Sequence, residues 1–186
     1  MKNINKLAKA IAKVLEVVHW VGAGLMACVA VCAIAAPGQL RHFMDLDGVT
    51  VSSGDALSVY GFELTSSEPG ALVDMKALFL FALGSVFIFI LLAMVFRNIY
   101  LIVKKSDGAS PFQKDNIRMI REIGIFSIAI PVLGLIISTI GFLVLNAEYV
   151  EIKVDLTGLV MGIIVLYLTQ VFAYGARLEN DVDGLV

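Results

Sequence analysis

The chain has 186 residues, of which 59% are hydrophobic and 16% charged, and its mean hydropathy is +0.91. These values lie far above those of soluble globular proteins, and the length leaves little room for a separate soluble domain. The net charge of −2 says little by itself, because the charged residues are sorted by sign along the chain. The composition therefore predicts a single integral membrane domain that covers residues 1–186 and does not bind nucleic acid directly.

Four uncharged stretches are each long enough to cross a bilayer, over residues 17–36, 77–96, 123–147 and 156–176. A hydrocarbon core of roughly 30 Å needs about 20 helical residues. The predicted spans cover about residues 15–36, 77–103, 123–147 and 156–177, with an outer loop at 38–75, an inner loop at 104–122 and a tail at 178–186. The predicted fold class is an all-α membrane protein, a four-transmembrane-helix bundle.

Residues 1–14 combine apolar positions at helical spacing with a basic face. This pattern predicts a helix that lies on the anionic inner leaflet before the first span. A cleaved signal peptide is the alternative, because lysines precede the apolar run and Ala33-Ile34-Ala35 could suit a signal peptidase. The run is longer than a typical signal peptide, and Glu16 and His19 interrupt its start. His19 is interpreted as a packed or solvated residue.

Small residues mark several faces of the spans. Cys28 and Cys32 share a helix face at a spacing that does not suit a disulfide, so they are interpreted as packing residues, with metal or redox chemistry as a remote alternative. The candidate packing positions of the third and fourth spans are Gly134, Ser138, Gly158 and Gly162. Such faces predict packing within one copy more often than dimer contacts. Pro131 predicts a kink in the third span.

The outer loop contains β-prone runs at residues 49–51 and 57–64, separated by Ser52-Ser53-Gly54-Asp55. The pattern predicts a β-hairpin with an irregular turn over residues 48–64. Residues 148–154 alternate polar and apolar side chains and could add a third strand. The expected result is a small extracytoplasmic cap of two or three strands.

The basic residues are distributed unequally about the four stretches. Eleven of the fourteen lie in the N-terminal segment, the inner loop and the tail, whereas the outer segments carry three basic residues and nine acids. The positive-inside rule therefore places both termini and the inner loop in the cytoplasm. In the inner loop, Ser110 and Pro111 form a helix-start signal, and Lys114, Arg118 and Arg121 follow on one face. This predicts a cytoplasmic amphipathic helix that runs into the third span.

The sequence offers little chemistry for catalysis. No Asp, Glu, Lys or Arg lies within the four stretches, and no metal-ligand spacing, Walker loop, nucleophile elbow or dinucleotide fingerprint is present. We therefore expect no enzyme activity, no cofactor and no metal site. A membrane-embedded enzyme is the third-ranked alternative.

Two segments on the predicted cytoplasmic side resemble a known family. Residues 108–124, GASPFQKDNIRMIREIG, are similar to the G-x-P-F, Asn and L-R-x-I-G signature of a bacterial four-span membrane family of unknown function. Residues 172–186, FAYGARLENDVDGLV, resemble the ending of that family. The resemblance covers essentially the whole chain and implies a bacterial inner-membrane location. It also implies a possible partner, since members are often encoded beside a small Cro/CI-type helix-turn-helix regulator.

These segments supply the candidate interaction residues: Pro111, Phe112, Asn116, Arg118, Arg121, Arg177, Glu179, Asp181 and Asp183. The basic helix and the acidic tail could form a weak, switchable latch on the inner face. The alternative is that the arginines hold lipid phosphates and the tail is solvated. The sequence favours a non-enzymatic protein that senses or relays a membrane or envelope state to a cytoplasmic partner such as the regulator. The second hypothesis is a small transport or permeability protein that acts as a homo-oligomer.

Overall fold

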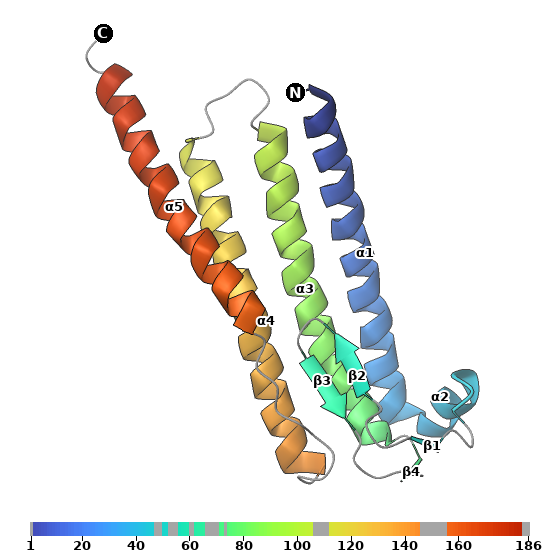
Figure 1. Ribbon diagram of the computed structural model, residues 1–186. Coiled ribbons are helices and arrows are strands. Elements are labelled where there is room, and N and C mark those ends of the chain that lie inside the picture. The colour runs from blue at the N-terminus through green and yellow to red at the C-terminus, as the bar shows by residue number, and fades with distance from the viewer. Residues whose placement is uncertain are drawn as a thin grey trace. The chain divides into compact units, whose positions relative to one another are not determined.

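The computed structural model describes residues 2–46, 50–51, 56–59, 62–65, 71–72, 74–105, 112–145 and 156–183. This part of the chain holds five helices and four short strands (Figure 1). The helices are α1 (Lys2–Ala35), α2 (Pro37–Phe43), α3 (Met75–Lys105), α4 (Lys114–Leu145) and α5 (Leu156–Asp183). The strands are β1 (Thr50–Val51), β2 (Ala56–Val59), β3 (Phe62–Thr65) and β4 (Ala71–Leu72).

Four of the helices confirm the expected membrane-crossing elements. α1, α3, α4 and α5 have 34, 31, 32 and 28 residues. At about 1.5 Å per residue each is more than 40 Å long, which exceeds the roughly 30 Å of a hydrocarbon core. All four are apolar enough to cross a membrane. The chain is therefore a multi-pass membrane protein by the length and composition of its helices.

The start of α1 differs from the sequence prediction. α1 is continuous from Lys2, so residues 2–14 are not a separate surface helix. No proline or glycine precedes Gly22, and each residue added to an existing helix gains a backbone hydrogen bond, so nothing interrupts α1. The basic segment after residue 113 is the beginning of α4, which runs on into the third apolar stretch as the sequence predicted. The expected cap at Ser110 and Pro111 lies outside the described residues.

The short helix α2 lies within the predicted outer loop and was not expected. α1 ends at Ala35, and Pro37 occupies the start of α2, where its fixed φ and missing N–H are tolerated. Leu40 of α2 is buried against Ala33 and Leu78. Apolar burial therefore holds this turn of chain against the ends of α1 and α3.

Strands form in the predicted outer segment, but their pairing differs from the prediction. β2 pairs with β3 in antiparallel register, Val59 opposite Phe62, so the connection between them is residues 60–61. β1 pairs instead with β4, Thr50 opposite Leu72. The expected hairpin between β1 and β2 is thus wrong. The proposed third strand at 148–154 and the proposed turn at 52–55 lie outside the described residues.

The chain divides into two compact units, and each is described by itself. Unit 1 contains residues 1–19, 91–129 and 157–186, and unit 2 contains residues 20–90 and 130–156. Unit 2 holds the strands, α2 and the apolar cluster of Ala33, Leu40 and Leu78. Unit 1 holds the two segments that carry the family resemblance. Within unit 1, α1 contacts α3, α3 contacts α4, and α4 contacts α5.

Candidate functional site

The α4–α5 contact in unit 1 is built on two facing glycines. A Cβ added at Gly162 would lie 2.4 Å from Ile128 Cγ1 and 3.0 Å from the Gly124 carbonyl oxygen. A Cβ added at Gly124 would lie 2.8 Å from the Leu166 side chain. Only glycine allows backbones to approach this closely, as in small-residue packing of membrane helices. Gly162 therefore lies close to the α4 backbone, opposite Gly124.

An aromatic contact joins the two segments that carry the family resemblance. The rings of Phe112 and Phe172 have centroids 5.6 Å apart and are tilted by 53°. A Cβ added at Gly175 would lie 2.7 Å from Phe112 Cε1, so the Phe112 ring lies directly on the α5 backbone. Phe112, two residues before the start of α4, is thus fixed against the second half of α5. The two sequence signatures meet at one contact.

Polar contacts join the ends of α3 and α4. Asn98 Nδ2 donates a hydrogen bond to Glu122 Oε2 at 2.9 Å, and Asn98 is buried. Arg118 Nε lies 3.6 Å from the other carboxylate oxygen of Glu122. Lys105 Nζ donates to Asp115 Oδ2 at 2.6 Å between exposed side chains. Glu122 therefore links a buried amide on α3 to a surface arginine on α4.

Two ionisable residues of α1 are buried in unit 1. Glu16 is 8% exposed and His19 is 4% exposed. Glu16 accepts a hydrogen bond from Lys13 Nζ at 3.0 Å. His19 Nδ1 lies 2.6 Å from the Leu15 carbonyl oxygen, and its ring centroid lies 5.1 Å from that of Phe96. His19 is therefore a packed residue, one of the two readings that the sequence allowed.

Two lysine amines, one from α1 and one from α3, lie over the same aromatic ring. Lys13 Nζ is 5.4 Å and Lys104 Nζ is 5.9 Å from the centroid of Tyr100. Cation–π attraction of this kind contributes about 0.5–1 kcal/mol at exposed sites. The Tyr100 ring thus brings together one lysine of α1 and one lysine of α3. These lysines lie at the end of unit 1 that also carries the Lys105–Asp115 pair.

The predicted interaction residues fall into three groups. Phe112 is half-buried and Asn116 is 1% exposed, so both are held inside unit 1. Five are exposed: Arg118, Arg121, Arg177, Glu179 and Asp181. Pro111 and the Asp183 side chain lie outside the described part of the chain. Arg118 pairs with Glu122 on its own helix, and the latch between the α4 arginines and the α5 acids stays a prediction.

The other predicted packing residues are distributed over both units. Gly134 and Ser138 are buried in unit 2, and Gly158 is half-buried in unit 1. Sequence reasoning did not assign roles to Asn98, Glu122 or Glu16. One signal was available for Glu16, since Glu16 and His19 are three residues apart and so share a helix face. Asn98 offered a weaker signal, an amide directly after an apolar run.

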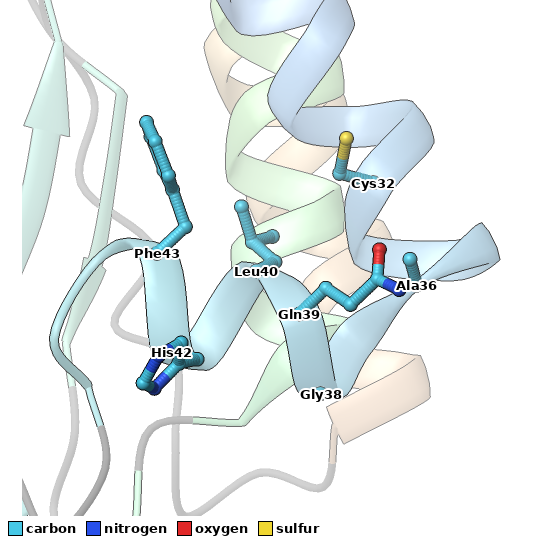
Figure 2. A pocket seen from close by; sticks show the side chains of 7 residues that line it. All are labelled: Cys32, Ala36, Gly38, Gln39, Leu40, His42 and Phe43. Carbon is cyan, nitrogen blue, oxygen red and sulfur yellow. The ribbon is translucent and has the colours of Figure 1, made fainter.

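Unit 2 contains a hollow of about 590 Å³ between the last turn of α1 and α2. Cys32, Gln39, His42 and Phe43 contribute to its lining (Figure 2). In Figure 2, Cys32 lies on α1, and the Gln39 side chain extends from α2 to the side of Ala36. Among the described residues no group of three His, Cys, Asp or Glu side chains is placed to hold a metal ion. The polar groups of this lining are the Cys32 thiol, the Gln39 amide and the His42 imidazole.

Near the Phe112–Phe172 contact, unit 1 carries exposed arginines on α4 and exposed acids on α5. No protein-family model, curated protein or solved structure matches the chain.

Proposed function

We propose that the protein is a non-enzymatic bacterial inner-membrane protein that relays a membrane or envelope state to a cytoplasmic partner. In this proposal both termini, the start of α4 and the end of α5 lie in the cytoplasm, where the positive-inside rule places them. The partner is a small helix-turn-helix regulator, as the family resemblance implies. The outer cap and α2 lie on the opposite side of the membrane.

One observation carries the proposal: the two signature segments are packed together through Phe112, Phe172 and Gly175. Residues 112 and 172 are 60 positions apart, and each is followed by exposed charges. An isolated solvated loop and an isolated solvated tail would not need this contact. The packing makes them one composite surface that a partner can recognise as a unit.

The charges of this surface give it a specific character. Arg118 and Arg121 of α4 and Glu179 and Asp181 of α5 are all exposed. Exposed charges contribute little to stability but strongly influence which partner associates and how fast. A regulator with complementary charges would therefore distinguish this surface from the lipid headgroups around it.

The helices supply a physical route for the relay. α4 and α5 are in backbone contact at Gly124 and Gly162 and in aromatic contact at Phe112 and Gly175. These contacts leave little freedom for either helix to move alone within unit 1. A change in bilayer thickness or tension that shifts α5 would consequently shift the composite surface as well.

The test is co-purification of the affinity-tagged full chain from native membranes, with mass spectrometry of the bound proteins. The proposal expects a small helix-turn-helix regulator to be recovered, with a several-fold loss for Arg121→Glu. Arg97→Glu is the matched control, because Arg97 is an exposed arginine of α3, a helix that carries neither signature segment. Asp181→Arg should partly restore binding to Arg121→Glu if the two side chains act together. Recovery of no cytoplasmic protein, or equal losses for the two arginine variants, contradicts the proposal.

A further inference from the structure

Two helices of unit 1 carry an exposed apolar stripe with alternating spacings of three and four residues. The α1 stripe consists of Ile4, Leu7, Ile11, Val14 and Val18, which are 51–71% exposed. The α5 stripe consists of Ile164, Tyr167, Val171, Tyr174 and Leu178, which are 47–65% exposed. Apolar residues repeating every 3.5 positions form the seam by which one helix packs along another.

The stripes are on the helices that the other contacts leave uncovered. Within unit 1, α3 contacts α1 through Phe96 and Tyr100 and contacts α4 through Asn98, and α4 contacts α5 through Gly124. In the most apolar window of α5 only 11% of residues are buried, against 44% and 39% for α3 and α4, and only Ala12 and Glu16 are buried among residues 4–18 of α1. α1 and α5 therefore each have a face available for another helix.

The two stripes lie at the same level along the helix axes of unit 1. Lys13 lies over Tyr100, Asn98 bonds Glu122, and Gly124 contacts Leu166. Following these contacts from helix to helix places residue 13 at about the level of residue 170, given 1.5 Å per residue. Within two residues of that alignment, Leu7 is level with Leu178, Ile11 with Tyr174, and Val14 with Val171. α1 and α5 of two copies standing side by side would thus meet stripe to stripe.

The charges at the helix ends are complementary. The first helical turns of α1 carry Lys2, Lys6, Lys9 and Lys13 and no acid in the first turn. The end of α5 carries Glu179, Asp181 and Asp183 and no base in the last turn. Each end thus carries the charge that its own helix dipole disfavours. An antiparallel neighbour brings the lysines and the positive dipole end of α1 to the acids and the negative dipole end of α5.

The complementary charges indicate which molecule covers the two stripes. A second α1 would place lysines against lysines, and an anionic lipid surface would repel the acids of α5. We propose that the occupant is a second copy of this chain, whose α5 packs antiparallel along α1 of the first. The interface joins two different surfaces, so it repeats from copy to copy, and a rotation axis along the membrane normal closes it into a ring.

Disulfide cross-linking of the full chain in native membranes tests this interface. The background carries Cys28→Ala and Cys32→Ala, which removes both native cysteines. Ile11→Cys with Tyr174→Cys in one chain should give a ladder of covalent oligomers under oxidation. Two differently tagged chains, one with each substitution, should give a mixed dimer. The control pair is Ile11→Cys with Ile164→Cys, which uses the same stripes about 15 Å out of level and should cross-link far less.

Each other outcome overturns the proposal. Dimers of the Ile11→Cys chain alone would mean that α1 packs on α1, and a monomer with a rapid internal disulfide would mean that α1 and α5 of one copy pack together. Cross-linking no stronger than the control would mean that lipid covers both stripes. A second measurement does not depend on substitutions: native mass spectrometry of the wild-type chain released from nanodiscs should show several copies, and a monomer contradicts the ring.

Discussion

The α4–α5 contact predicts that a single methyl group at Gly162 destabilises the fold. In Gly162→Ala the new Cβ would meet Ile128 Cγ1 at 2.4 Å, the Gly124 carbonyl oxygen at 3.0 Å and the Ile128 nitrogen at 3.1 Å. Two of these three atoms belong to the α4 backbone and cannot rotate away. The helices must therefore separate by several tenths of an ångström.

The magnitude follows from two opposing effects. Overpacking of a tight contact costs about 1–3 kcal/mol, whereas alanine favours the helix over glycine by about 1 kcal/mol. Because the contact is with backbone, we expect a net loss of about 1–2 kcal/mol, a factor of roughly 5–30 in the folded-to-unfolded ratio. The assay is SDS-driven unfolding in mixed detergent micelles, with the folded fraction measured by pulse proteolysis.

Gly24→Ala is the matched control, because a Cβ added at Gly24 has nothing within 4 Å. It adds the same methyl group to a membrane helix and should leave stability unchanged or raise it by up to about 1 kcal/mol. Equal stabilities of Gly162→Ala and Gly24→Ala would refute the close approach of α4 and α5.

Two further predictions concern the other contacts of unit 1. Phe112→Ala should cost roughly 1–3 kcal/mol, less than a fully buried phenylalanine, since Phe112 is half-buried against Gly175; unchanged unfolding in the same assay would show that the aromatic contact contributes nothing. Asn98→Ala should cost about 1.5–3 kcal/mol, because it removes a hydrogen bond to a charged group at 2.9 Å. A double-mutant cycle with Glu122→Gln measures the coupling between the two residues, and strictly additive effects would count against this bond.

The spans were predictable because hydropathy and length together determine which segments enter a bilayer. The stretch at 77–96, for example, contains no charged residue and lies wholly within α3. The ends of the helices were less predictable, since the polar residues before Val17 signal an interface but do not stop α1.

Helix partners could not be read from the sequence for a physical reason. Lipid tails are as apolar as leucine, so a lipid-facing residue such as Ile163 and a helix-facing one such as Leu166 look alike. Gly162 could be recognised by its GxxxG spacing, but that spacing does not say that Gly124 lies opposite. The prediction of the strand pairing was also wrong. β1 pairs with β4 across 19 intervening residues (52–70) and not with the adjacent β2. Glu122 was missed because its partner, Asn98, lies 24 positions away on another helix.

The most direct test of the proposed relay is which side of the membrane carries the loop before α4. Asp107→Cys and Asp55→Cys are introduced separately into a chain lacking Cys28 and Cys32, and intact cells are treated with a thiol reagent that does not cross the membrane. The account predicts that position 55 is labelled from outside and that position 107 is labelled only after the cells are opened. Labelling of 107 in intact cells, with 55 protected, would place the composite surface of Phe112, Phe172 and Gly175 outside and contradict a cytoplasmic partner.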